Sequence, residues 1–170
     1  MSPFGMGYVE DPLPGHEMFR GCLAIPYMRW SQWRGWSVAS IRFRNLSGDG
    51  PKYLTVAGDS PRMFNTVALI RYTPRIAITE GELDAVASQL AGLPAVGLPG
   101  ASTWRPFMRE LFLGYRDVFV LADGDEPGMK FANKVATDLP NAKVIPMPNG
   151  SDVNQLVNDE GPQALLDRIR

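Results

Sequence analysis

Acidic residues in the second half of this 170-residue chain come shortly after hydrophobic runs. The four acids that follow such runs are Glu80, Asp123, Asp125 and Asp152. The runs before them, such as 75–79 and 118–122, are apolar and rich in β-branched residues, as buried strands are. Carboxylates that a fold brings together repel one another where water is partly excluded, so they need a positive partner. The simplest such partner is a divalent metal ion.

The cysteine and histidine content limits the metal to one that is bound through oxygen. The chain has one cysteine, Cys22, and one histidine, His16, too few for a zinc site or a disulfide framework. Oxygen ligands favour Mg²⁺ or Mn²⁺. We interpret Cys22 as a small buried hydrophobic residue and assign no chemical role to His16.

The composition is that of a globular protein, with 45% hydrophobic and 21% charged residues. No apolar run approaches the roughly 20 residues that a membrane span needs. The N-terminal residues lack the basic and hydrophobic segments of a signal peptide. We therefore predict a cytoplasmic protein without a membrane partner.

The net charge of −1 conceals an uneven distribution. Residues 20–75 carry nine basic and two acidic side chains, whereas residues 76–170 carry eight basic and thirteen acidic ones. A basic half joined to an acidic half indicates a polyanion on one side and metal ions on the other. The alternative, that the basic residues merely solvate one face, stays open at this point.

The acidic half alternates short apolar runs with stretches of helical periodicity. The predicted strands are 75–79, 95–98, 118–122 and 142–145. Leu83, Val86, Ala87 and Leu90 have the spacing of one helical face after the first of them. This alternation predicts an α/β fold, with a parallel sheet that is flanked by helices. Ligands bind at the carboxyl ends of the strands in such sheets, so the four acids should project into one crevice.

Each acid also has a structural alternative. Asp123 and Asp125 are compatible with loop and helix-capping roles, and Asp152 with capping the helix that follows it. Acids in the first turn of a helix also complement the helix dipole, as is expected of Glu82, Asp84 and Glu126.

The segments Glu80-Gly81-Glu82-Leu83-Asp84 and Asp123-Gly124-Asp125-Glu126-Pro127-Gly128, with Asp152 behind them, resemble the Toprim domain. Primases, type IA and II topoisomerases and related nucleases share this domain, and the resemblance covers about residues 75–158. The third motif of the family often has Lys before its Asp and a further Asp after it. In this chain Ser151 replaces the Lys and Asn154 replaces the further Asp, a pattern closer to some phage primases.

The basic half is predicted to form a small β-rich N-terminal subdomain over residues 1–72, followed by the Toprim domain at 73–170. A strand at 23–29, a turn and a returning strand at 36–44 precede a Lys-Tyr-Leu segment at 52–54. This order resembles the N-terminal subdomain of DnaG-like and phage primase cores, which topoisomerases and Toprim nucleases lack.

The resemblance implies a DNA primase core, a nucleotidyltransferase that makes short RNA primers on single-stranded DNA from ribonucleoside triphosphates. Glu80, Asp123 and Asp125 would be catalytic, and these three with Asp152 would bind two Mg²⁺ or Mn²⁺ ions. Glu80 either coordinates metal or accepts the proton of the attacking hydroxyl. The alternatives are a metal-dependent Toprim nuclease and a non-catalytic nucleic-acid-binding module.

Period-two alternation puts Arg42 and Arg44 on one face of their strand, and the resemblance implies that both, with Lys52, contact template or nucleotide phosphates. Trp30, Trp33 and Trp36 either stack single-stranded bases or cover a small hydrophobic lobe, and we favour the second interpretation. The chain has no ligand set for a zinc-binding module and no phosphate loop of a helicase. We expect both partners to be supplied elsewhere, in the cytoplasm of a bacterial or phage-infected cell.

Overall fold

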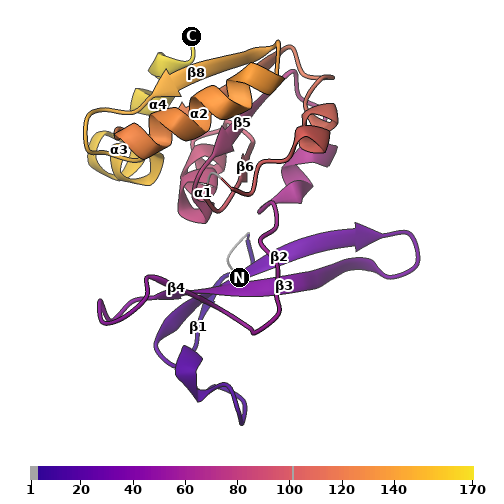
Figure 1. Cartoon of the computed structure of the whole chain (residues 1–170), viewed down its shortest axis with the longest axis vertical. Coiled ribbons are helices and arrows are strands. Elements are labelled where there is room, and N and C mark those ends of the chain that lie inside the picture. The colour runs from indigo at the N-terminus through magenta and orange to yellow at the C-terminus, as the bar shows by residue number, and fades with distance from the viewer. Residues whose placement is uncertain (1–3, 101) are drawn as a thin grey trace. The chain divides into compact units, whose positions relative to one another are not determined.

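The computed structural model of the protein describes residues 4–100 and 102–170 and contains two compact units (Figure 1). The N-terminal unit is Met1–Ser60 and the C-terminal unit is Pro61–Arg170. The second unit begins twelve residues before the predicted start at residue 73 because the segment after Pro61 packs with it. The backbones of Phe64 and Gly97 exchange hydrogen bonds of 2.8 and 3.2 Å.

The N-terminal unit is an antiparallel sheet of strands in the order β1-β2-β3-β4. Its elements are β1 (Gly7–Tyr8), the 3-10 helix η1 (Glu17–Phe19), β2 (Cys22–Ser31), β3 (Gly35–Asn45) and β4 (Tyr53–Thr55). The predicted strands at 23–29 and 36–44 are therefore confirmed. Cys22 is buried beside Phe19 and Phe43, whose rings stack at 3.9 Å, which confirms its interpretation as a small buried residue.

The C-terminal unit has a four-stranded sheet in which every pairing is parallel. Its strands are β5 (Arg75–Thr79), β6 (Ala95–Gly97), β7 (Asp117–Ala122) and β8 (Ala142–Pro146). Its helices are η2 (Thr66–Ile70), α1 (Glu82–Leu90), η3 (Pro106–Leu111), α2 (Glu126–Asp138), α3 (Val153–Glu160) and α4 (Pro162–Arg168). All four predicted strands are present, and the predicted fold class is confirmed: α/β, with a β-rich part before the parallel sheet.

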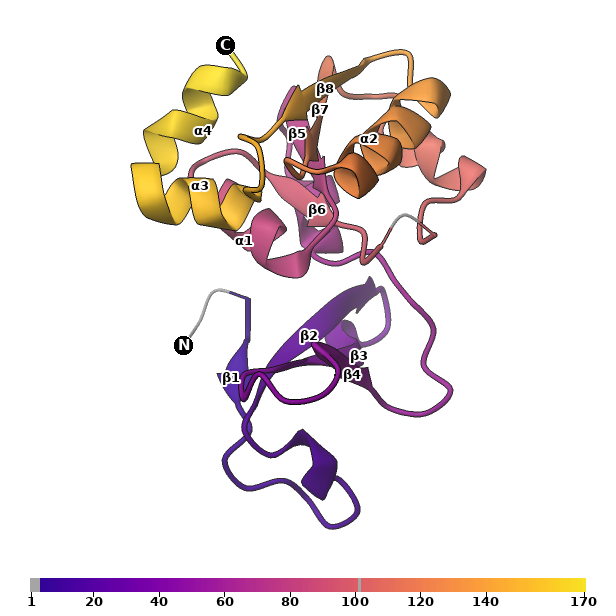
Figure 2. The same ribbon diagram turned by 60° about the vertical axis from the view of Figure 1, so that its left-hand side comes forward.

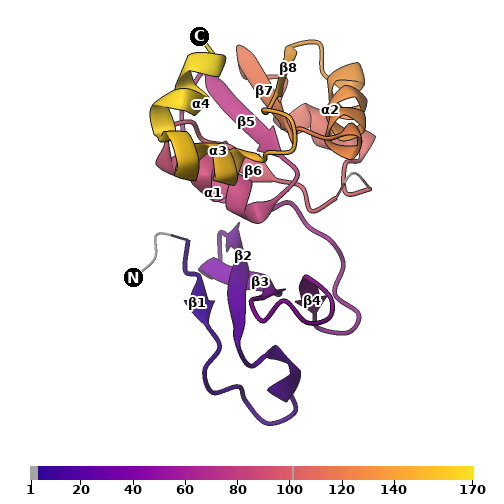
Figure 3. The same ribbon diagram turned by 90° about the vertical axis from the view of Figure 1, so that its left-hand side faces the viewer.

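Helices cover both faces of this sheet. Helices α1, α3 and α4 pack together on one face, and α2 packs on β7 and β8 from the other (Figures 2 and 3). After their first residues, the central strands β5 and β7 are buried and almost entirely apolar, because helices on both faces leave no solvated side for polar residues. The largest buried side chains of this core include Trp104, Phe112 and Phe131.

The predicted apolar stripe of α1 is wrong in part. Leu90, which was expected on the buried face, is 68% exposed. The buried residues of α1 are small or acidic: Glu82, Asp84, Ala85, Ala87 and Ser88. Small side chains suit this face because the start of the helix lies very close to β6. A Cβ atom on Gly97 would lie 2.8 Å from the carbonyl oxygen of Gly81.

Within the described residues, no helix is long and apolar enough to cross a membrane.

Candidate functional site

The strand order β6-β5-β7-β8 places a topological switch between β5 and β7. The chain leaves β5 for the neighbouring edge strand β6 and then returns to β7 on the other side of β5. In open parallel sheets, a crevice for ligands forms beside the carboxyl ends of the strands at such a switch. Glu80 directly follows β5, and Asp123 directly follows β7.

Backbone hydrogen bonds join the loop before α3, residues 147–152, to the loop between β7 and α2, residues 123–125. The N–H of Gly124 donates to the carbonyl of Ser151 at 2.8 Å, and the N–H of Gly150 donates to the carbonyl of Gly124 at 2.8 Å. Gly124 has no space for a side chain, because a Cβ atom there would collide with the carbonyl oxygen of Pro148. The two acidic motifs therefore pack backbone to backbone.

A hydrogen bond also joins the Glu80 motif to the start of α3. The backbone N–H of Asn154 donates to Asp84 Oδ1 at 2.9 Å, although the two residues are 70 positions apart. Asp84 is 7% exposed. The carboxyl ends of β5 and β7 and the start of α3 thus share one acidic cluster.

The negative charges of this cluster act on one another. Burial, followed by the charges of Asp84, Glu80, Asp152 and Asp125, raises the pKa of the Asp123 carboxyl to about 7. Burial, followed by the charges of Asp125 and Asp84, raises the pKa of Glu80. Asp123 is therefore partly protonated at neutral pH, and any cation in the cluster would relieve the repulsion.

Two buried carboxylate oxygens, Glu80 Oε1 and Asp123 Oδ1, have no hydrogen-bond partner among the described residues. A buried oxygen in this state costs free energy unless a ligand satisfies it. Oxygen donors of this kind fit Mg²⁺ or Mn²⁺. The side chains are not arranged as a finished site, because among the described residues no three acidic, histidine or cysteine side chains form a metal-binding group.

Asp125 and Asp152 are both helix caps. Asp125 Oδ1 accepts from the N–H of Gly128 at 2.7 Å, and Asp152 Oδ1 accepts from the N–H of Gln155 at 2.7 Å. The structural alternative considered for these two acids is therefore observed. Capping does not exclude metal binding, because a carboxylate has a second oxygen and several lone pairs.

The acids beyond the predicted set differ in their surroundings. Asp84 and Glu82, which the sequence assigned to the helix dipole, are buried, and Asp84 contributes to the raised pKa of Asp123. Their position two and four residues after Glu80 was the available signal. Glu126 is exposed and pairs with Lys130 at 2.7 Å, as a solvated residue of a helix surface does.

The predicted phosphate-binding residues lie on the N-terminal unit. Arg42 and Arg44 both approach the ring of Tyr53, at 4.0 and 5.7 Å from its centroid. Arg44 Nη1 also donates to the hydroxyl of Tyr53 at 3.1 Å. Lys52 precedes this tyrosine and is exposed. The structure therefore brings the two arginines together, and their proposed role opposite the carboxylates stays a prediction.

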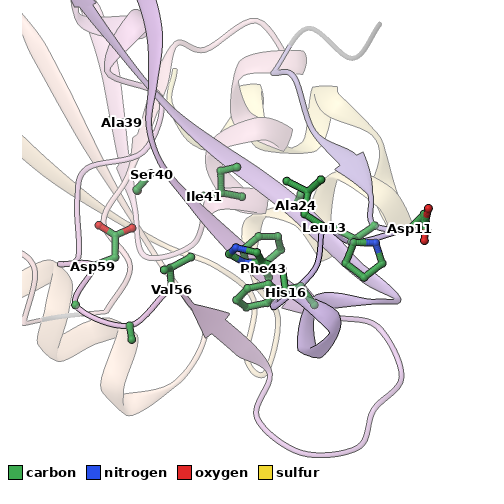
Figure 4. Close-up of a pocket in the computed structure, with 15 residues that line it drawn as sticks. Asp11, Leu13, His16, Ala24, Ala39, Ser40, Ile41, Phe43, Val56 and Asp59 are labelled. Atoms are coloured by element: carbon green, nitrogen blue, oxygen red, sulfur yellow. The ribbon is translucent and has the colours of Figure 1, made fainter.

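The other face of the same strand lines a cavity of about 660 Å³ (Figure 4). Ala39, Ile41 and Phe43 contribute to its wall, so the predicted alternation with Arg42 and Arg44 is confirmed. The ionisable residues of the lining are Asp11, His16 and Asp59, without Lys or Arg. The cavity is thus unsuited to phosphate groups.

The interpretation of the three clustered tryptophans as hydrophobic cover is wrong. Trp30 is 60% exposed, Trp33 is 90% exposed and Trp36 is 42% exposed. They lie at the end of the β2–β3 hairpin, and none of them belongs to the hydrophobic clusters of the described residues that contain Phe43 or Phe131. Period-two patterns cannot reveal this, because a free hairpin and a sheet have the same alternation.

Comparison with known proteins links the chain to one family of domains. Residues 77–157 match the model of the Toprim-like family. The chain is 64% identical over 152 residues to the Gene 57 protein of Mycobacterium phage D29. The aligned region covers 89% of this chain and 100% of that protein. It is 30% identical over 171 residues to the DNA primase of Pseudomonas putida, covering 91% of this chain but 25% of the primase.

Solved structures with this fold include the DnaG catalytic core. It matches with a TM-score of 0.71 at 26% identity, over 89% of this chain and 52% of that core. The DnaG primase catalytic domain bound to ssDNA matches with a TM-score of 0.67 at 27% identity, over 89% of this chain and 51% of that domain. The chain thus spans about half the length of these structures and a quarter of the Pseudomonas primase.

Proposed function

The chain belongs to the Toprim-like family of DnaG-type primase cores, and we propose that it synthesises short RNA primers on single-stranded DNA by metal-dependent nucleotidyl transfer. The observation that carries this proposal is the acidic cluster at the switch between β5 and β7. Its two unpartnered buried oxygens, on Glu80 and Asp123, create a need for a cation that the protein's own side chains do not meet. Residues 20–75, with nine basic and two acidic side chains, supply complementary charge for a polyanion.

Glu80, Asp123, Asp125 and Asp152 would hold Mg²⁺ or Mn²⁺, two ions by family resemblance. When bound, such ions supply positive charge to the attacking hydroxyl and to the leaving pyrophosphate. The chain's own contribution is rigidity, because Asp125 and Asp152 are oriented by the helix starts that they cap. Asp84, tied to the N–H of Asn154, adds a fifth negative charge to the cluster.

Glu80 has two candidate roles, as a metal ligand or as the acceptor of the hydroxyl proton. Its pKa is raised by burial and by Asp125 and Asp84, which favours proton acceptance in the metal-free state. A bound cation reverses this shift because it stabilises the ionised carboxylate. We therefore propose that Glu80 is a metal ligand in the loaded enzyme.

Arg42, Arg44 and Lys52 are proposed to contact template or nucleotide phosphates. Arg44 is held by the hydroxyl of Tyr53, so its guanidinium is positioned before a ligand arrives. We propose a zinc-binding module or a helicase as a partner for initiation at a preferred template sequence, because the single Cys22 and the single His16 are too few for a zinc site.

The test is incorporation of labelled ribonucleotide on single-stranded DNA with Mg²⁺ or Mn²⁺. Asp123→Ala and Glu80→Gln should abolish incorporation. Glu126→Gln is the matched control, because Glu126 is an exposed acid that pairs with Lys130, and this variant should retain activity. Incorporation that survives both active-site substitutions would refute the proposed site. Template cleavage without synthesis would instead assign the cluster to a nuclease.

A further inference from the structure

The β2–β3 hairpin extends beyond its neighbours as a two-stranded ribbon (Figure 1). Strand β1 pairs with β2 at Leu23 and Ala24, and β4 pairs with β3 at residues 42–44. Residues 27–40 pair with each other beyond these flanks, and the register shifts between Tyr27 and Met28. A bulge of this kind increases the local twist and gives the ribbon its own direction.

The ribbon presents aromatic rings on a defined surface. Trp30 and Trp36 are direct cross-strand partners, so both side chains leave the same face of the ribbon. Met28 and Val38, the next pair on this face, extend the apolar stripe. Trp33 lies at the apex of the turn, which the N–H of Arg34 closes by donating to Ser31 Oγ at 3.1 Å.

The exposure of these rings is unusual for residues that bury large apolar areas in most folds. Trp33 is 90% exposed, and the directly paired Trp30 and Trp36 are 60% and 42% exposed. Exposed rings gathered at one place on a surface mark an interaction site more often than isolated ones do. A tryptophan side chain has only two rotatable bonds, so little conformational entropy is lost when a flat partner stacks on it.

The positive charge around the hairpin limits which partners can bind its aromatic surface. Residues 18–48 contain five arginines and no aspartate or glutamate. Arg29 lies on the face opposite Trp30, where its Nε donates to Ser37 Oγ at 3.3 Å, and Arg34 lies in the turn. A second copy of the same hairpin would bring these cations against their own kind. A partner with flat apolar groups on an anionic backbone matches both features.

We propose that the hairpin tip, residues 28–38, binds single-stranded nucleic acid. Unpaired bases stack on Trp30, Trp33 and Trp36, and phosphates contact Arg34 in the turn. The inference rests on the proposed function only for the identity of the strand, which would be the DNA template. Duplex DNA binds less well, because its bases are already stacked on one another.

Binding of a short oligo(dT) strand, measured in EDTA without nucleotides, tests the proposal apart from catalysis. Trp33→Ala should weaken binding roughly fivefold or more, the loss expected for one stacked base, and Trp33→Phe should retain most of the affinity. Tyr8→Ala is the control, because Tyr8 is an aromatic residue of the same sheet that is 64% exposed. It should bind as the wild type does.

Tryptophan fluorescence gives a second readout on the unaltered chain. Oligo(dT) should quench the exposed tryptophans, whereas Trp104 is 1% exposed and donates to Asp138 Oδ2 at 2.7 Å, out of reach of a base. Arg34→Gln should lower the salt dependence of binding, by about 0.7 in the log–log slope for one phosphate contact to a single strand.

Unchanged oligo(dT) affinity in Trp33→Ala and in the Trp30→Ala/Trp36→Ala double variant would overturn the proposal. Loss of self-association in the same variants would then assign the surface to a second copy of the chain. Failure of the primase proposal has a different signature. In that case the wild type makes no primer, yet the tryptophan variants still lose affinity for the strand.

Discussion

Replacing Asp123 by asparagine should stabilise the metal-free protein while it removes the response to metal. Ionising this carboxyl in the fold is unfavourable, because burial and four neighbouring carboxylates raise its pKa from 3.8 to about 7. Asparagine has almost the same shape but no charge, so it adds no repulsion to Glu80 and the other acids of the cluster. The substitution therefore relieves repulsion in the absence of metal.

The size of the effect follows from proton linkage. A carboxyl with a raised folded-state pKa has almost no penalty below about pH 3, where both states are protonated. As the pH rises from about 4 to 7, the unfolded chain ionises first, and stability falls. The full shift corresponds to roughly 4 kcal/mol, which we reduce to about 1–2 kcal/mol because solvent screens this half-buried group. For a protein of this size, the melting temperature should rise by about 2–8 °C at pH 8.

Thermal unfolding in EDTA and in Mn²⁺, at pH 5 and pH 8, measures this prediction. The variant's advantage should be smaller at pH 5, where the folded wild type keeps its proton. Mn²⁺ should stabilise the wild type at pH 8 and have little effect on the variant. Glu126→Gln, an exposed acid, should behave as the wild type does. A variant that is less stable than the wild type in EDTA at pH 8, or that gains as much from Mn²⁺, would refute the reasoning.

Three further substitutions test the site. Gly124→Ala should destabilise the protein by about 1–3 kcal/mol in chemical denaturation, because its Cβ collides with the Pro148 carbonyl; unchanged stability would contradict the close packing of the two loops. Asp152→Ala should lose the cap of α3, about 1 kcal/mol, whereas Asp152→Ser should keep the cap and still bind metal more weakly. Equal metal affinity of Asp152→Ser and the wild type would limit Asp152 to capping. Lys52→Ala should reduce the salt dependence of template binding by about one phosphate contact, and an unchanged slope in a salt titration would remove Lys52 from the interface.

Local patterns predicted the C-terminal sheet well. Strands such as 75–79 and 118–122 are buried on both faces, so their central residues are all apolar and the runs stand out from their surroundings. The ends of these two strands also predicted that Glu80 and Asp123 would lie at the carboxyl edge of the sheet. Helix α1 was harder, because its closeness to β6 selects small buried residues, and the leucine spacing suggested a different face.

The contacts that complete the candidate site were beyond the reach of sequence patterns. The bond from Asn154 to Asp84 joins residues 70 positions apart, and the bonds between the loops of Gly124 and Ser151 involve backbone atoms that every residue has. The exposure of Trp33 depends on how far the hairpin extends beyond its neighbouring strands. Such properties follow from chain topology, which a local pattern does not contain.

The replacement of a family acid by Asn154 does not separate Asp152 from the cluster. Asp152 caps the helix whose first turn donates, through the N–H of Asn154, to Asp84. Its charge also contributes to the raised pKa of Asp123, together with that of Asp84. The bond to Asp84 uses only the backbone of residue 154, and the Asn154 side chain accepts from Asn158 Nδ2 at 3.3 Å. The neutral side chain at 154 is thus compatible with a cluster whose negative charge comes from Asp84 instead.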